Sequence, residues 1–235
     1  MSTPTRPLSA GEGLGALLSR SFNLLFAQLG LYVVIYLAVS VPVAVVTHLM
    51  VRMMGVHVSI YSPAGTAALM TLGNTALLAL SVPGLVGGAL VLGALLHTVR
   101  TQMGGGKTSL GEAFKTALSK WLPLVAVSVV TFAAVYMGLY LLVLPGLAAL
   151  FFLCLAPIAL MVDDAGVGQA LSRSCSLALK VPGEIVVIGL IAFMATLVLG
   201  LIPLIGWLAN AVVIPWTLIA LTLAYGKAKK MATPA

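Results

Sequence analysis

The sequence predicts an all-α integral membrane protein with six transmembrane helices, and three observations support this fold class. Of the 235 residues, 61% are hydrophobic and only 7% are charged. A soluble domain carries about 25% charged residues, so 12 basic and 5 acidic side chains are too few to cover a water-facing surface. The charges are also clustered, and the uncharged stretches between them have the lengths of single or paired membrane spans.

The first two uncharged stretches each predict one span. A bilayer core about 30 Å thick takes about 20 helical residues. Residues 21–51 contain a predicted span at Leu24–Val46. Residues 53–99 begin with loop-like residues and then run apolar from Ala67 to Val99. We interpret this second run as one long, tilted helix that is kinked at Pro83-Gly84.

The last two uncharged stretches each predict a hairpin of two spans. Residues 121–162 and 185–226 are 42 residues long, which is twice the length of one span. Proline and glycine interrupt helical patterns, so Pro145-Gly146 is the expected turn of the first hairpin. Residues 203–206 contain the expected turn of the second.

The basic residues predict that both termini lie in the cytoplasm. Cytoplasmic loops carry an excess of Lys and Arg. With the N-terminus inside, Arg52 is the one basic residue on an outer segment, and the other eleven of the 12 lie on inner segments. No cleavable signal peptide is expected, because the first apolar run starts near Leu24 and is longer than a signal-peptide core.

A weak internal repeat organises this single membrane domain, residues 1–235. Similar short segments begin at Ser9, Ser109 and Gly166 and define repeat units of about 9–99, 109–162 and 166–226. Two of them fit a capping box, in which a serine and a glutamate three residues later satisfy each other's backbone N–H groups. The predicted pairs are Ser9 with Glu12 and Ser109 with Glu112.

Each repeat is expected to start with a short amphipathic helix at the cytoplasmic interface. Leu14, Leu17 and Leu18 share one helical face, and so do Phe114, Ala117 and Leu118. In this interpretation the apolar face enters the acyl boundary and the cations meet lipid headgroups. The alternative is that these segments are the inner ends of tilted spans. The candidate headgroup contacts are Arg20, Lys115, Lys120 and Arg173.

The paired carboxylates Asp163 and Asp164 are the most conspicuous polar feature. Such a pair can serve as an acid/base or a metal site. However, the three histidines show no ligand spacing. Helix caps, or ion pairs with Arg173 or Lys180, are therefore favoured. We expect no metal, no cofactor and no catalytic residue.

The segment Gly104–Thr108 resembles a phosphate-binding loop only superficially. A P-loop needs glycine six positions before its lysine, and Thr101 stands there before Lys107. A flexible linker that leads into the Ser109 cap explains the same residues. Nucleotide binding is therefore disfavoured.

The polar residues within the predicted spans are few and uncharged. Asn74 and Asn210 are candidate intramembrane positions, more often used for interhelical hydrogen bonds than for substrate. The absence of a charge in mid-membrane argues against a proton-coupled pump. Gly84 and Gly88 form a GxxxG spacing, which would allow close helix approach within the bundle or between protomers.

Several short motifs in the second half resemble a known family. They are Leu144-Pro145-Gly146, Ala156-Pro157, Asp163-Asp164 and the run 168–174. Together they resemble the YciC-like bacterial inner-membrane proteins and the membrane domain of some glycerophosphodiester phosphodiesterases. That family usually has glutamate where this chain has Asp163. The resemblance implies a six-span protein of the bacterial cytoplasmic membrane. It does not imply phosphodiesterase activity, which belongs to a separate soluble domain.

These patterns leave three hypotheses for function. The leading one is a non-catalytic protein that acts on anionic membrane lipid or a membrane partner, including a second copy of itself, in an envelope-homeostasis or scaffold role. The rival is a permease for an amphiphilic or small apolar solute, with Asn74 and Asn210 as a polar lining. The third is an enzyme that uses Asp163 and Asp164. Nucleic-acid binding is not expected, because no basic patch is interleaved with aromatic residues.

Overall fold

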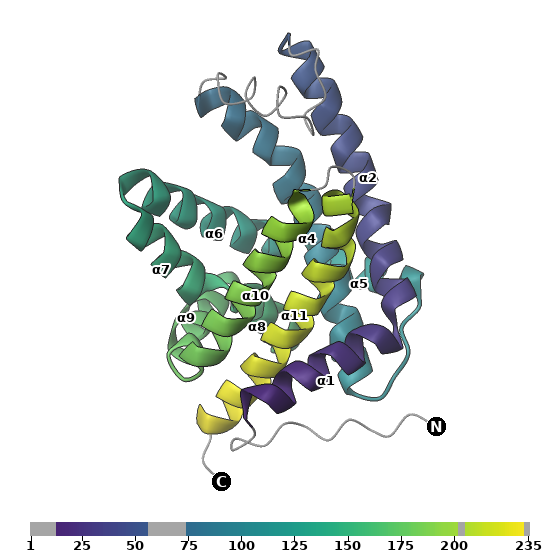
Figure 1. Ribbon diagram of the computed structural model, residues 1–235, viewed down its shortest axis with the longest axis vertical. Coiled ribbons are helices and arrows are strands. Elements are labelled where there is room, and N and C mark those ends of the chain that lie inside the picture. Colours follow the sequence, from purple (N-terminus) through teal and green to yellow (C-terminus); the bar gives the residue numbers. More distant parts are fainter. Residues whose placement is uncertain (1–12, 56–73, 202–204, 233–235) are drawn as a thin grey trace.

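The computed structural model describes residues 13–55, 74–201 and 205–232, and every secondary-structure element in these ranges is a helix (Figure 1). The helices in chain order are α1 (Leu14–Ala27), α2 (Leu29–Met53), α4 (Asn74–Met103), α5 (Leu110–Ser119), α6 (Trp121–Leu141), α7 (Val143–Leu153), α8 (Ala156–Val162), α9 (Val167–Ala178), α10 (Pro182–Gly200) and α11 (Ile205–Ala232).

Six of the helical segments are long and apolar enough to cross a membrane, which confirms the predicted fold class. The fourth segment, Val143–Val162, is made of α7 and α8 together. The other five lie in α2, α4, α6, α10 and α11. The chain is therefore a multi-pass membrane protein by the length and composition of its helices.

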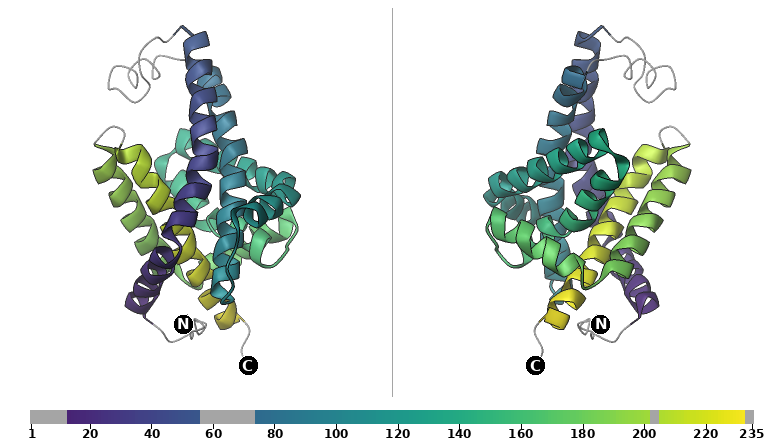
Figure 2. Two further views of the ribbon diagram at one scale, coloured as in Figure 1. Left: turned by 90° about the vertical axis from the view of Figure 1, so that its right-hand side faces the viewer. Right: turned by 90° about the vertical axis from the view of Figure 1, so that its left-hand side faces the viewer.

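Helix α11 is the most enclosed of the six segments. In its most apolar stretch 61% of the residues are buried, against 11% in α6 and in α10. In Figure 1, α11 crosses the middle of the molecule between α2 and the α6–α7 hairpin, and the turned views show α10 and α11 paired along one side (Figure 2). We call the end of the bundle where α4 and α11 finish, and where α6 and α10 begin, the basal end.

Two predicted boundaries were wrong. The first span begins at Leu29 rather than Leu24, because the chain breaks at Gln28 and residues up to Ala27 belong to the preceding helix α1. The α6–α7 turn is at Leu142, before Pro145-Gly146. A proline in the first turn of a helix is tolerated because its missing N–H would have no partner there.

Glycines bring the helices together at positions other than the predicted GxxxG pair. A Cβ atom on Gly84 or Gly88 would meet nothing within 4 Å. A Cβ on Gly87 would lie 2.4 Å from Val43 of α2, and one on Gly93 would lie 2.7 Å from Leu124 of α6. Close approach to neighbouring helices in α4 therefore depends on Gly87 and Gly93.

Helix α5, which precedes the α6–α7 hairpin, is attached to the bundle through two small side chains. In α5, Ala113 and Ala117 are fully buried, and Ala117 lies against Gly93 of α4. Of the side chains predicted to face the acyl boundary, Ala117 packs on the protein instead, because Gly93 of α4 leaves room for a small side chain there. Leu118 stays 61% exposed.

Helix α9 closes a break within the fourth span. The Ser174 hydroxyl donates to the Phe152 carbonyl at 2.6 Å and accepts from the Leu155 N–H at 3.1 Å. These two backbone groups lie at the junction of α7 and α8. Unpaired backbone groups are costly in a membrane span, where water is absent. The single Ser174 side chain of α9 removes this cost for both groups.

Candidate functional site

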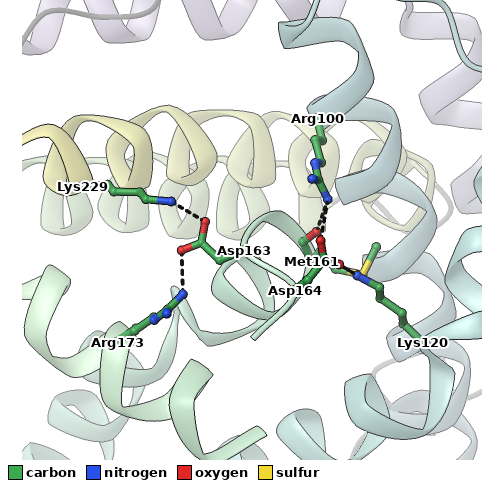
Figure 3. Close-up of polar contacts among 7 residues, drawn as sticks. All are labelled: Arg100, Lys120, Met161, Asp163, Asp164, Arg173 and Lys229. Atoms are coloured by element: carbon green, nitrogen blue, oxygen red, sulfur yellow. Dashed lines mark hydrogen bonds and ion pairs between the residues drawn. The ribbon is translucent and has the colours of Figure 1, made fainter. Parts of the chain in front are cut away.

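The turn between α8 and α9 gathers charged side chains from several helices at the basal end. Figure 3 shows Asp163 between Arg173 of α9 and Lys229 of α11. An Asp163 oxygen lies 3.0 Å from Arg173 Nη1, and the other lies 2.7 Å from Lys229 Nζ. The Tyr225 hydroxyl also donates to Asp163 at 2.7 Å. The Asp163 side chain is only 8% exposed, so this carboxylate ties α9 and α11 to the turn.

The neighbouring carboxylate, Asp164, points to the other side of the turn. It pairs with Lys120, which lies between α5 and α6, and with Arg100 of α4 at 3.6 Å (Figure 3). Arg100 also donates to the carbonyl of Met161 at 2.9 Å. Asp164 is 59% exposed and has a φ of 51°, a left-handed conformation that aspartate tolerates better than most residues.

The surroundings of Asp163 keep it ionised. Burial raises the pKa of this carboxyl, but the hydrogen bonds from Lys229 and Tyr225, together with the charges of Lys229 and Arg173, outweigh burial and hold the pKa below its usual range. A general acid or base at neutral pH needs a pKa near the working pH. This environment therefore suits a structural ion pair better than proton transfer.

The ion-pair alternative for the two aspartates describes the structure, and the cap alternative is wrong. Helix α9 is capped by Gly166 without any side-chain hydrogen bond. Of the two predicted partners, Arg173 pairs with Asp163, whereas Lys180 does not belong to the cluster. The described residues contain no group of three His, Cys, Asp or Glu side chains that could hold a metal ion.

A second buried ion pair joins α10 to α11 beside this cluster. Lys227 Nζ lies 2.7 Å from Glu184 Oε1, and the two side chains are 8% and 16% exposed. Sequence reasoning missed this pair and also missed Arg100, Tyr225 and Lys229. The partners are 43 to 66 residues apart, so no local spacing could have indicated them.

A cavity of about 840 Å³ opens elsewhere at the basal end, where α1 meets α2; its lining is mixed, and we call it the polar cavity because it has more polar surface than the other cavities described. One wall is the α1–α2 junction, and the opposite wall is the segment Gly105–Leu110. Gln102 of α4 fixes this arrangement. Its amide donates to the carbonyl of Leu24 at 2.7 Å, and its carbonyl accepts from the Tyr32 hydroxyl at 2.5 Å.

A different cavity of about 400 Å³ lies between α2 and α4, higher in the bundle. Its lining is almost entirely apolar and includes Gly84 and Gly88, which explains why a Cβ on either glycine would meet nothing. Asn210 is not among its lining residues. The side chain of Asn74 lies outside the described residues, and Asn210 is half-buried in α11.

The remaining predicted residues fall into distinct environments. Ser109 and Glu112 form the expected capping box at the start of α5, whereas Ser9 and Glu12 lie outside the described residues. Of the four candidate headgroup contacts, Lys120 and Arg173 are engaged by the two aspartates. Lys115 is exposed on α5, and Arg20 lines the polar cavity. Cys154 and Cys175 are free thiols.

No protein-family model, curated protein or solved structure matches this chain.

Proposed function

We propose that the protein is a non-catalytic multi-pass protein of the bacterial inner membrane, with both termini and the basal end in the cytoplasm. It engages anionic lipid of the inner leaflet, in an envelope-homeostasis or scaffold role. The YciC-like resemblance and the eleven basic residues on inner segments support this placement. The ion-paired state of the two aspartates favours a non-catalytic role over an enzyme.

The exposed side of α5 is the observation that carries the lipid interaction. Ala113 and Ala117 attach this helix to the bundle, so Leu110 and Leu118 remain exposed beside the cation Lys115. Helix α1 has a comparable side, because Phe22 and Phe26 are exposed while Leu17 is buried. An apolar stripe next to a cation at the end of a membrane span suits the boundary between headgroups and acyl chains.

The orientation is tested by cysteine accessibility. In a background with Cys154 and Cys175 replaced by serine, Ser59→Cys should react with an impermeant maleimide in intact cells. Thr108→Cys should react only after permeabilisation. The opposite pattern would place the basal end outside and would remove the inner leaflet as the lipid source.

The lipid preference is tested on the purified protein in nanodiscs of mixed composition. Native mass spectrometry should show phosphatidylglycerol retained in preference to phosphatidylcholine, and the preference should weaken as salt is raised. Equal retention of the two lipids would defeat the proposed function.

The permease alternative places a polar solute path at Asn74 and Asn210, but the cavity between α2 and α4 has an apolar lining that does not include Asn210.

A further inference from the structure

The N-terminus of α2 faces the polar cavity with free backbone donors. The break at Gln28 starts a new helix of 25 residues, and no side chain caps it. Tyr32 is the first residue of α2 whose N–H reaches a carbonyl, that of Gln28. In the described chain, the N–H groups of Leu29, Gly30 and Leu31 have no hydrogen-bond acceptor, and all three residues line the cavity. Such a helix start attracts anions through its N–H groups and its dipole.

Two cations from different parts of the chain line the same cavity. Arg20 comes from α1, and Lys107 comes from the segment between α4 and α5. In the part of the chain that the structure describes, neither forms an ion pair with a carboxylate, whereas Lys120 and Arg173 do. Arg20 and Lys107 therefore bring two positive charges to the cavity that no carboxylate of the described protein neutralises.

The glycines before Lys107 have a geometric role that explains their resemblance to a phosphate-binding loop. Gly105 has a φ of +80°, which few other residues adopt. A Cβ on Gly106 would lie 2.8 Å from the Thr101 side chain. The glycines thus let the chain turn back sharply after α4, and this turn carries Lys107 and Thr108 to the cavity.

The position and the lining of the cavity indicate an amphiphilic ligand. It lies where α2 begins and α4 ends, which is the membrane boundary of both spans. Phe26, Leu29 and Leu110 contribute apolar groups beside the polar ones. A volume of about 840 Å³ exceeds the needs of a lone phosphate ion and falls in the range of sites for larger ligands.

We infer that this cavity binds the phosphate headgroup of one anionic glycerophospholipid. Arg20, Lys107 and the first N–H groups of α2 hold the phosphate. The inference rests on the proposed function and names its site. Ser109 takes no part in binding the phosphate, because its N–H and hydroxyl are committed to Glu112.

The test compares two charge-matched double variants. Arg20→Gln with Lys107→Gln removes both cavity cations, and Arg52→Gln with Lys180→Gln removes two exposed cations that lie outside the cavity and outside the exposed side of α5. Native mass spectrometry of delipidated protein, titrated with phosphatidylglycerol in detergent, should show one high-affinity adduct. The cavity variant should bind that lipid about thirtyfold more weakly, since each of the two cations near a headgroup contributes about 1 kcal/mol. The control variant should change it less than threefold.

A third variant blocks the cavity without changing its charge. A Cβ on Gly30 would meet nothing within 4 Å, so Gly30→Phe can extend into the open space. It should abolish the adduct while the unfolding temperature stays near that of the parent. Retention of the adduct in Gly30→Phe, or equal weakening in the two double variants, would overturn the site but leave a diffuse lipid interaction intact. Absence of any phosphatidylglycerol preference in the parent would instead defeat the proposed function itself.

Competition with inorganic phosphate tests whether the cavity binds the phosphate of a lipid or a free phosphate ion. At millimolar concentration it should leave the phosphatidylglycerol adduct of the parent unchanged, because the apolar wall favours the intact lipid. Displacement of the lipid by inorganic phosphate would overturn the assignment of a lipid as the occupant.

Discussion

The two adjacent aspartates allow a matched test of what the charged cluster does for stability. Asp163→Asn and Asp164→Asn remove one charge each and keep the side-chain shape. Asp163 is 8% exposed and has three partners, whereas Asp164 is 59% exposed. Asparagine is also compatible with the left-handed backbone at position 164. A difference in stability between the two variants therefore reflects the surroundings of each carboxylate and not backbone strain at position 164.

The expected loss of stability in each variant follows from how deeply its carboxylate is buried. Asp163→Asn replaces a charge-assisted hydrogen bond from the buried Tyr225 with a neutral one and leaves Arg173 and Lys229 without their counter-charge. Both cations are about half exposed, so water compensates part of the loss. We expect about 2 kcal/mol of destabilisation, below the 3–5 typical of a fully buried broken pair. Asp164→Asn should cost about 1 kcal/mol or less.

The assay is unfolding of the purified protein in mild detergent by added SDS, followed through tryptophan fluorescence. A loss of about 2 kcal/mol corresponds to a fall of roughly 4–8 °C in a parallel thermal melt for a chain of this size. Arg173→Gln combined with Asp163→Asn should cost less than the sum of the single variants, because the two residues share one interaction. A larger loss from Asp164→Asn than from Asp163→Asn would refute the assignment of stability to the buried carboxylate.

Three further predictions test the packing and electrostatics of the bundle. The pKa of Asp163 is held low in the folded protein, so the ionised carboxylate should stabilise the fold fully above about pH 4, and this stabilisation should be lost as the pH falls below that value. SDS titrations at pH 3 to 7 should therefore show a smaller loss of stability on acidification in Asp163→Asn than in the parent. Ser174→Ala should destabilise the protein by about 1–2 kcal/mol, because it orphans the Phe152 carbonyl and the Leu155 N–H, and a similar loss in the exposed Ser176→Ala would contradict this role. Gly93→Ala should lower the unfolding temperature because its Cβ would meet Leu124 and Ala117, whereas Gly88→Ala should leave it unchanged, and the reverse order would restore the GxxxG pair as the packing contact.

Local sequence patterns predicted the features that depend on neighbours along the chain. The spans follow from uncharged stretches, since a lipid-facing helix must be apolar over its whole length. The Ser109–Glu112 capping box follows from a fixed spacing of three residues. The α6–α7 turn at Leu142 was missed because Pro145 is accommodated in the first turn of a helix as readily as it would be in the turn itself.

The sequence by itself determined that this chain is helical, multi-pass and basic, because composition and charge spacing alone control transfer into a bilayer. Only the tertiary structure decided which basic side chains remain available to bind an anionic ligand. Lys120 and Arg173 looked equivalent to Arg20 along the chain, but the fold brings aspartates to the first two and a cavity with free N–H groups to the third. Those contacts join residues far apart in sequence, and they depend on where glycine and alanine let the helices approach each other.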